Sequence, residues 1–420
     1  MHYSDEFTKR NYAGCLILLA ILFGGTTKQG IWSDSLLYVL AIPAVIIGFS
    51  NFFENRLGVI ARGFCVAILV ILAAQFLPVD IIKNLPEYQT PIERSQFLTT
   101  VPSRSFNLII TSIVLLGFFL YLATLSDDSL QSLIKFVFIG VALNALITVI
   151  QLSFDSKIVI SGLLPYTIRM GTFQNANHFS SLSYLVIPFL AWRFLLIRWN
   201  PVLYIIAGLV LTGLQIAVGA RAGMIISTSL FMLCFVWAIT FKKSLAVKVI
   251  TCFVGVAIVG YLFLTQDSSN LTDISGRDYY FAKSWEIAKQ NWLTGTGLGS
   301  FFSIWPIYED TGSLGKEYIT HVHNDYIELF LETGISFFIL LTIFIALIVR
   351  NGLKNEFTQA ASISIFAVMI HSFVDYPLRT MAISMVFILT IAIILTNQEE
   401  AEGREKKKVK HRSRKAVTQI

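Results

Sequence analysis

Long apolar stretches separated by short polar breaks dominate this chain. A helix needs about 20 apolar residues to cross the hydrocarbon core of a bilayer. We predict twelve such spans, at residues 12–27, 35–53, 59–78, 106–125, 130–151, 174–196, 201–219, 222–240, 246–264, 334–350, 358–373 and 379–396. The alternation of polar and apolar residues in segments of about ten, which is typical of a transmembrane β-barrel, is absent from the sequence. The pattern therefore predicts an all-α integral membrane protein.

One long hydrophilic stretch, 265–333, interrupts the pattern between the ninth and tenth predicted spans. Composition supports the same class, since only 14% of the residues are charged and soluble domains carry about 25%. The four cysteines all fall within apolar spans and are interpreted as small buried hydrophobic residues. A membrane protein with one such loop is expected to carry out its chemistry there, at the bilayer surface.

The distribution of Lys and Arg predicts the orientation. Most of the 32 basic residues lie in the N-terminal arm, the short loops of one side and the tail 397–420, so we assign that side to the cytoplasm. We expect a bacterial inner membrane protein with both termini cytoplasmic, a polytopic domain over 1–396, and 265–333 as a periplasmic catalytic loop. We expect the basic cytoplasmic tail to bind anionic membrane lipids. Because no aromatic residues are interleaved with its basic residues, we expect no binding to nucleic acid.

The end of this loop, His321-Val-His-Asn-Asp-Tyr-Ile-Glu328, carries the densest group of chemical side chains. If a helix starts at Asn324, then His321, Asp325, Glu328 and Glu332 share one face at helical spacing. A neutral imidazole can accept a proton from a hydroxyl near pH 7, which favours a base-containing site. Two alternatives stay open: a metal site built from His321, Asp325 and Glu328, which has no tight signature to support it, and a polar helix start capped by Asn324 or Asp325.

Three arginines on the predicted external side are candidates for anion binding. Arg221 lies in a short external turn, and Arg277 precedes a stretch that resembles an amphipathic surface helix. Arg169 begins a segment that continues through Asn175 to His178, and the polar Asn and His residues just inside the sixth span suggest a site that faces the lumen. Guanidinium groups bind phosphates in bidentate fashion. The alternative for Arg221 is snorkelling to the interface, and for the Arg169 segment a turn with a helix cap.

Two further features lie on the same predicted side. His371 and Asp375, four residues apart at a helix end before a proline, are interpreted as a supporting pair for the site or as an ordinary capped helix end. The glycines of the segment 295–299 resemble a phosphate-binding loop only superficially, because no Gly-Lys-Thr follows. We interpret that segment as a flexible turn.

These segments together resemble the O-antigen ligase and polymerase superfamily of bacterial envelope enzymes. The resemblance covers roughly residues 160–380 and rests on the long external loop, on the motif His323-Asn-Asp-Tyr-Ile-Glu, and on the segments around Arg169, Arg221 and His371. The His-Asn-x-Tyr-x-Glu element in this context is specific, whereas the N-terminal third matches only in being apolar.

The resemblance implies a glycosyltransferase with a GT-C-like membrane fold that needs no metal or cofactor. The donor would be a glycan on undecaprenyl diphosphate. The acceptor would be lipid A-core for a ligase or a growing glycan for a polymerase, with ligase slightly preferred. A protein glycosyltransferase and a lipid-linked sugar transporter remain alternatives. By resemblance, His323 is the catalytic base, and Arg221, Arg277 and Arg169 bind the diphosphate. The supporting residues are Asn324, Asp325, Tyr326, Glu328, His321, Asn175, His371 and Asp375.

Overall fold

The computed structural model is predominantly helical over the residues it describes, which are 2–27, 32–82, 84, 92, 96–154, 170–241, 275–309 and 319–396. The helices are α1 (His2–Phe23), α2 (Trp32–Ser50), α3 (Val59–Ala74), α4 (Pro102–Leu122), α5 (Asp127–Phe154), α6 (Ala176–Ala191), α7 (Pro201–Ala217), α8 (Arg221–Thr240), α10 (Ser275–Gln290), α11 (Phe301–Tyr308), α12 (Asp325–Thr333), α13 (Ile335–Asn351), α14 (Glu356–His371) and α15 (Met381–Leu395). In this part of the chain β-pairing is limited to two isolated bridges.

Eleven of the twelve predicted spans coincide with helices. The exception, 246–264, lies outside the described residues, as does the tail 397–420. Among the described residues, five helices are long and apolar enough to cross a membrane, including Trp32–Ser50, Pro102–Leu122 and Ala176–Ile197. Shorter apolar helices include Val59–Ala74 and Met381–Leu395. An integral membrane protein is therefore supported, while the count of twelve spans stays a prediction.

Local sequence explains where several helices begin. α7 starts with Pro201 in its first turn, and the Asn200 side chain accepts a hydrogen bond from the amide of Leu203. α14 starts with a reciprocal capping box between Asn355 and Thr358. Each start satisfies amide groups that a helix leaves without partners. The helix ends at polar breaks are thus specified locally.

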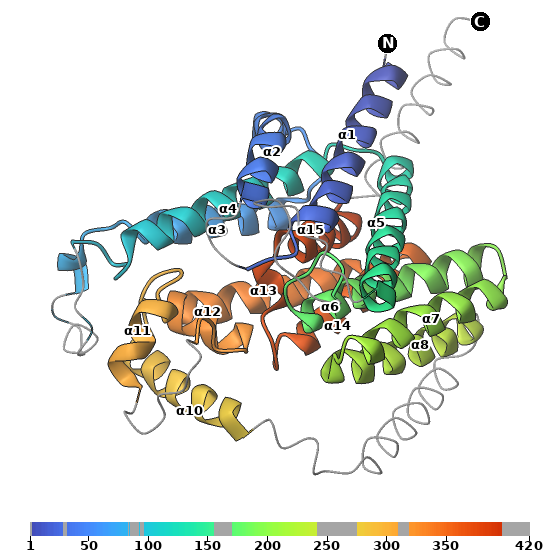
Figure 1. The fold of residues 1–420 in the computed structure, drawn as a ribbon. Helices are drawn as coiled ribbons and strands as arrows, with labels where there is room; N and C mark the ends of the chain where they lie inside the picture. The colour runs from blue at the N-terminus through green and yellow to red at the C-terminus, as the bar shows by residue number, and fades with distance from the viewer. Residues whose placement is uncertain are drawn as a thin grey trace, which may run out of the picture.

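The helices α6, α14 and α15 occupy the middle of the molecule (Figure 1). α6 packs against α8 and α14, and α15 packs against α1, α4 and α14. Fully buried apolar residues such as Phe118, Ile187 and Val368 fill this core. By contrast, Val59, Val70 and Leu209 are 83%, 60% and 65% exposed. Large aliphatic side chains on an outer surface are what a hydrocarbon solvent permits.

A second, smaller core joins α10, α11 and α12, which lie together at one side of the bundle (Figure 1). Trp305 of α11 packs among the aromatic rings of Tyr280 and Phe301, and Trp285 of α10 packs against Phe330 of α12. α12 continues through Gly334 into α13. The predicted catalytic loop therefore contains a packed helical unit that is attached directly to the membrane helices.

The glycine-rich segment 295–300 is a turn that fastens this unit in place. Gly295, Gly297 and Gly299 all have positive φ, and Gly297 lies so close to Thr99 that an added Cβ would meet Thr99 Oγ1 at 2.2 Å. The amides of residues 295–300 donate to Asn291 O, Leu331 O, Glu332 O, Gln75 Oε1, Glu332 Oε1 and Gly297 O respectively. With these donors already used, the turn has no free amide nest for a phosphate. It is held by hydrogen bonds and is not the loose turn expected from the sequence.

Candidate active site

The histidine motif lies where α12 begins, and it is held from both sides. Asn324 caps the helix, because its Oδ1 accepts hydrogen bonds of 3.0 Å from the amides of Tyr326 and Ile327. Its Nδ2 donates to the carbonyl of Phe373 at 2.9 Å. The capping alternative is therefore correct for Asn324. The same cap fixes the position of the residue before it, His323.

His323 has a left-handed backbone, with φ of +59°. Such a conformation costs an ordinary residue about 1–3 kcal/mol and persists only where the surroundings enforce it. Here the amide of Val322 donates to Glu328 Oε2 at 2.9 Å, and the amide of Asp325 donates to the carbonyl of Ser372 at 3.0 Å. Strain at a single histidine that is fixed on both flanks is typical of a functional position.

The side chain of His323 faces a buried carboxylate. His323 Nδ1 lies 3.5 Å from Asp375 Oδ1, at an ion-pair distance, and the two side chains are 28% and 0% exposed. Asp375 Oδ1 also accepts a hydrogen bond of 2.9 Å from the amide of Tyr376. Burial alone would raise the pKa of Asp375, but the neighbouring His323 imidazole holds it well below its usual range. A carboxylate at Nδ1 leaves Nε2 as the nitrogen that can accept a proton.

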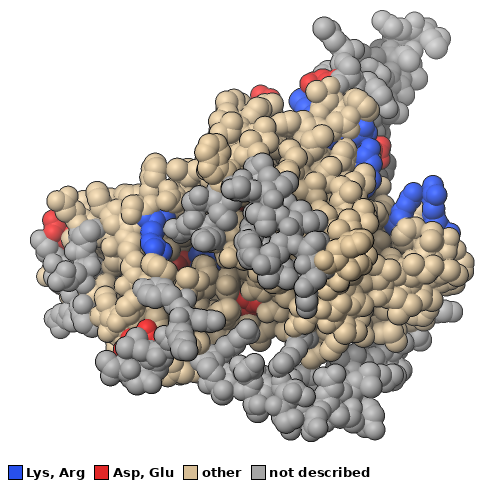
Figure 2. Space-filling model, in the orientation of Figure 1, with Lys and Arg blue, Asp and Glu red and all other residues tan. Residues whose placement is uncertain are grey.

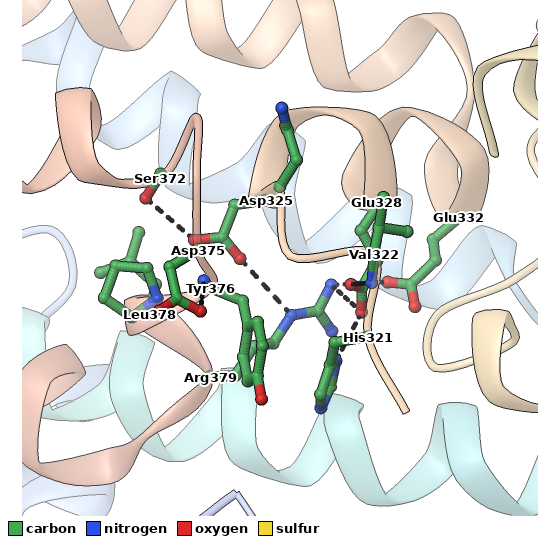
Figure 3. A network of polar contacts seen from close by, with 12 residues as sticks. His321, Val322, Asp325, Glu328, Glu332, Ser372, Asp375, Tyr376, Leu378 and Arg379 are labelled. Atoms are coloured by element: carbon green, nitrogen blue, oxygen red, sulfur yellow. Dashed lines mark hydrogen bonds and ion pairs between the residues drawn. The ribbon is translucent and has the colours of Figure 1, made fainter. Parts of the chain in front are cut away.

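Next to this pair, one guanidinium holds three acids of α12. Arg379 Nη2 lies 3.0 Å from Glu332 Oε2 and 3.3 Å from Glu328 Oε1, and Arg379 Nε lies 3.9 Å from Asp325 Oδ1 (Figure 3). The predicted common face of Asp325, Glu328 and Glu332 is thus confirmed. His321 precedes the helix and joins the group through Glu328, with 2.8 Å between Nδ1 and Oε1.

The three carboxylates respond differently to burial. Burial raises the pKa of Asp325 to about 7, although Arg379 opposes the shift. Burial also raises the pKa of Glu332, again against Arg379. For Glu328 the effect of burial is overcome by Arg379 and His321, so its pKa is lowered. Arg379 and His321 therefore favour the ionised form of Glu328, whereas burial favours the protonated forms of Asp325 and Glu332. Acidic atoms are visible within the hollowed middle of the face in Figure 2.

His371 and Asp375 are linked differently from the predicted pair. The amide of Asp375 donates to the carbonyl of His371 at 3.1 Å. The His371 side chain, at the end of α14, contacts α6, because its Nδ1 lies 2.9 Å from Ser181 Oγ. Asp375 is the member of the pair that faces His323.

The structure leaves the predicted diphosphate arginines largely untested. Arg169 lies outside the described residues, and Arg221 and Arg277 are known only by their helices, α8 and α10. Two residues after Arg221, Gly223 lies against Ser180 of α6, since an added Cβ would meet Ser180 Oγ at 2.1 Å. The start of α8 therefore lies beside the first turns of α6. The convergence of the three arginines on His323 stays a prediction.

Two other predicted residues have structural roles. Asn175 caps α6, accepting a hydrogen bond of 2.8 Å from the amide of Asn177. Tyr326 packs its ring on Phe373 and donates its hydroxyl hydrogen bond to the carbonyl of Met369 at 2.7 Å. These contacts position the site without adding chemistry. Within the described residues, no group of three or more His, Cys, Asp or Glu side chains is arranged to hold a metal ion.

Sequence reasoning missed Arg379 and Tyr376, and it marked His178 only as a polar residue just inside the sixth span. Arg379 lies four residues after Asp375 in the sequence. A guanidinium at the border of an apolar span must find an acidic partner, and that signal could have found it. Tyr376 contacts the rings of His178, His321 and His323, with centroids 4.9, 4.3 and 4.9 Å away. Nothing in the local sequence indicates that one tyrosine gathers three histidines.

Comparison with known proteins adds a family to this geometry. The family model described as O-antigen ligase matches residues 177–342, and no curated protein matches the chain significantly. The matched stretch contains His178, His321 and His323 and stops before Asp375 and Arg379. The match supports, over residues 177–342, the resemblance to the O-antigen ligase and polymerase superfamily that was drawn from the sequence.

Proposed function

We propose that this protein transfers a glycan from undecaprenyl diphosphate to an acceptor hydroxyl at the periplasmic face of the bacterial inner membrane. The observation that carries the proposal is the strained, partly exposed His323 against the buried, ionised Asp375. The O-antigen ligase family match supports this general type of activity. Within the superfamily we favour a ligase with lipid A-core as acceptor. A polymerase of O-antigen or exopolysaccharide is the alternative.

His323 Nε2 takes the proton of the acceptor hydroxyl. The acceptor oxygen then forms its bond to the anomeric carbon of the donor sugar as the bond from that carbon to the diphosphate oxygen breaks. The imidazolium that forms is stabilised by Asp375, whose carboxylate keeps Nδ1 protonated. The electron pair leaves with undecaprenyl diphosphate, so no metal or cofactor enters this scheme.

Negative charge grows on the diphosphate as the bond breaks. Guanidinium groups stabilise that charge more in the transition state than in the ground state. Arg221, Arg277 and Arg169 are the candidates for this role. Arg379 is a poor candidate, because its guanidinium lies against three carboxylates and is only 13% exposed.

The test is a glycan profile of cells that carry only a variant protein. His323→Ala should abolish the surface polymer while the protein remains inserted. His411→Ala, which changes the same residue type in the predicted tail, is the matched control and should leave the polymer unchanged. Normal polymer in the His323→Ala cells would refute the mechanism.

The same profile separates the alternatives. Long polymer that accumulates on undecaprenyl diphosphate, with bare lipid A-core, indicates a ligase. A single repeat unit on the lipid, with core carrying at most one unit, indicates a polymerase. Donor retained at the cytoplasmic face would instead favour a transporter.

A further inference from the structure

A second histidine, His178, lies against the carboxylate that faces His323. His178 Nε2 is 3.8 Å from Asp375 Oδ1, the same oxygen that lies 3.5 Å from His323 Nδ1. The ring of Tyr376 meets both imidazoles edge to face, with both centroid distances 4.9 Å and interplanar angles of 83° and 71°. Asp375 is thus placed between two imidazoles that come from segments 145 positions apart in the chain.

The start of α6 fixes the position of His178. Asn175 caps the helix, and the preceding Gln174 is tied to the chain after α1: its amide donates to Gly25 O at 3.0 Å, and Thr26 Oγ1 donates to its Oε1 at 2.7 Å. His178 lies in the first turn of the helix. The positive end of a helix dipole therefore lies on the same side as the carboxylate of Asp375 and favours its charge.

Burial makes a hydrogen-bonding role for His178 necessary. The side chain is 1% exposed, and neither ring nitrogen has a hydrogen-bond partner among the described residues. A buried polar group left unsatisfied costs about 1–3 kcal/mol. The acceptor closest to hand is Asp375 Oδ1. Since Asp375 Oδ2 is likewise without a partner among these residues, the carboxylate is held only through Oδ1.

We propose that His178 is a positioning residue for the reaction: its neutral imidazole donates from Nε2 to Asp375 Oδ1 and so fixes the carboxylate against Nδ1 of His323. The inference rests on the proposed function of His323. Catalytic hydrogen bonds are often long without substrate and shorten in the complex, and closing 3.8 Å to about 2.9 Å requires a shift of less than about 1 Å. His178 neither gains nor loses a proton in the step, because the proton of the acceptor stays on His323.

Three substitutions at His178 separate hydrogen bonding from packing. Gln carries an amide nitrogen at nearly the place of Nε2, Asn carries the same group one carbon shorter, and Leu fills similar volume without a donor. The assay uses full-length protein in detergent, donor lipid extracted from cells that lack this protein, and their membranes as acceptor. It measures the release of undecaprenyl diphosphate.

We expect His178→Leu and His178→Asn to lose about 10-fold in kcat with KM changed less than about twofold, and His178→Gln to stay within about threefold of the wild type. A merely structural role would not separate Gln from Asn. Equal activity of Gln and Asn variants, or wild-type activity of the Leu variant, would overturn the proposal. If the Leu variant does not fold, the Gln and Asn pair decides.

A second readout does not depend on turnover. Diethyl pyrocarbonate modifies exposed imidazoles, and fragment masses distinguish His323 from His321. The rate of modification at His323 should fall several-fold in the Leu and Asn variants and recover in the Gln variant, since a misplaced carboxylate no longer supports the reacting nitrogen. Full activity of His323→Ala would refute the proposed function, whereas unchanged modification of His323 in all three variants would refute the role of His178.

Discussion

Removing Arg379 tests the electrostatic account of the site most directly. Its side chain, 13% exposed, lies within 4 Å of Asp325, Glu328 and Glu332, which are 5%, 1% and 0% exposed. Breaking a buried ion pair by deleting one partner costs about 3–5 kcal/mol, because the remaining charge stays buried. Arg379→Met keeps most of the side-chain volume and should therefore destabilise the protein by that amount.

The measurement is thermal unfolding in detergent, followed by intrinsic fluorescence. At about 2 °C for each kcal/mol, the midpoint should fall by roughly 6–10 °C. The loss of stability should be larger at pH 8 than at pH 6. At pH 6, protonation of the buried carboxylates removes part of the negative charge that Arg379 no longer compensates. Adding Glu332→Gln removes one of the uncompensated carboxylates and should restore part of the loss.

Arg198→Met is the matched control. Arg198 is exposed at the end of the π-helical turn Trp192–Ile197 that follows α6, and such a surface change should stay within about 0.5 kcal/mol. A wild-type midpoint for Arg379→Met at pH 8 would refute the buried network. So would a double variant with Glu332→Gln that is no more stable than Arg379→Met alone.

Three further predictions follow from the same contacts. Burial raises the pKa of Asp325 to about 7 and raises that of Glu332 as well, so near neutral pH the folded protein binds protons that the unfolded chain releases. The free energy of unfolding should therefore fall as pH rises from about 5 to 8. Glu332→Gln should make the unfolding midpoint less dependent on pH. Gly297→Ala should destabilise the protein by about 1–3 kcal/mol, because φ is +107° and the new methyl group meets Thr99; a midpoint equal to that of the wild type would contradict the packing of the turn. Asp375→Asn should lower kcat by about 10²-fold or more with little change in the unfolding midpoint, since it keeps the shape but removes the charge that holds the base in its tautomer; a variant with wild-type kcat would contradict the pairing.

Much of the architecture could be predicted because it is local. The apolar runs coincide with helices wherever the structure describes them, since a run of that length buries its backbone hydrogen bonds within itself. The spacing of Asp325, Glu328 and Glu332 gave their common face for the same reason. Asn324 was read as a possible cap, and it is one.

The chemistry of these residues depended on contacts that no local spacing contains. Arg379 could not be assigned a role from the sequence, because its partners lie 47–54 positions away. They are on α12, which is next to Arg379 only in the folded protein. The sequence paired Asp375 with His371, four residues away, but the turn after α14 directs Asp375 to His323. The sequence predicts a flexible turn at the glycines of the segment 295–299. In the structure that turn is fixed by hydrogen bonds to Gln75 and Glu332 and by close packing against Thr99.

By itself the sequence determined a helical membrane protein that resembles the O-antigen ligase superfamily over part of its length, with its candidate base at the end of a polar loop. Hydropathy and helical periodicity are properties of neighbouring residues, so they can be read along the chain. The tertiary structure alone decided which carboxylate faces His323, that His178 shares it, and that Arg379 holds three acids together. These are contacts between helices, and they are set by how the buried faces of α6, α12 and α14 pack in three dimensions.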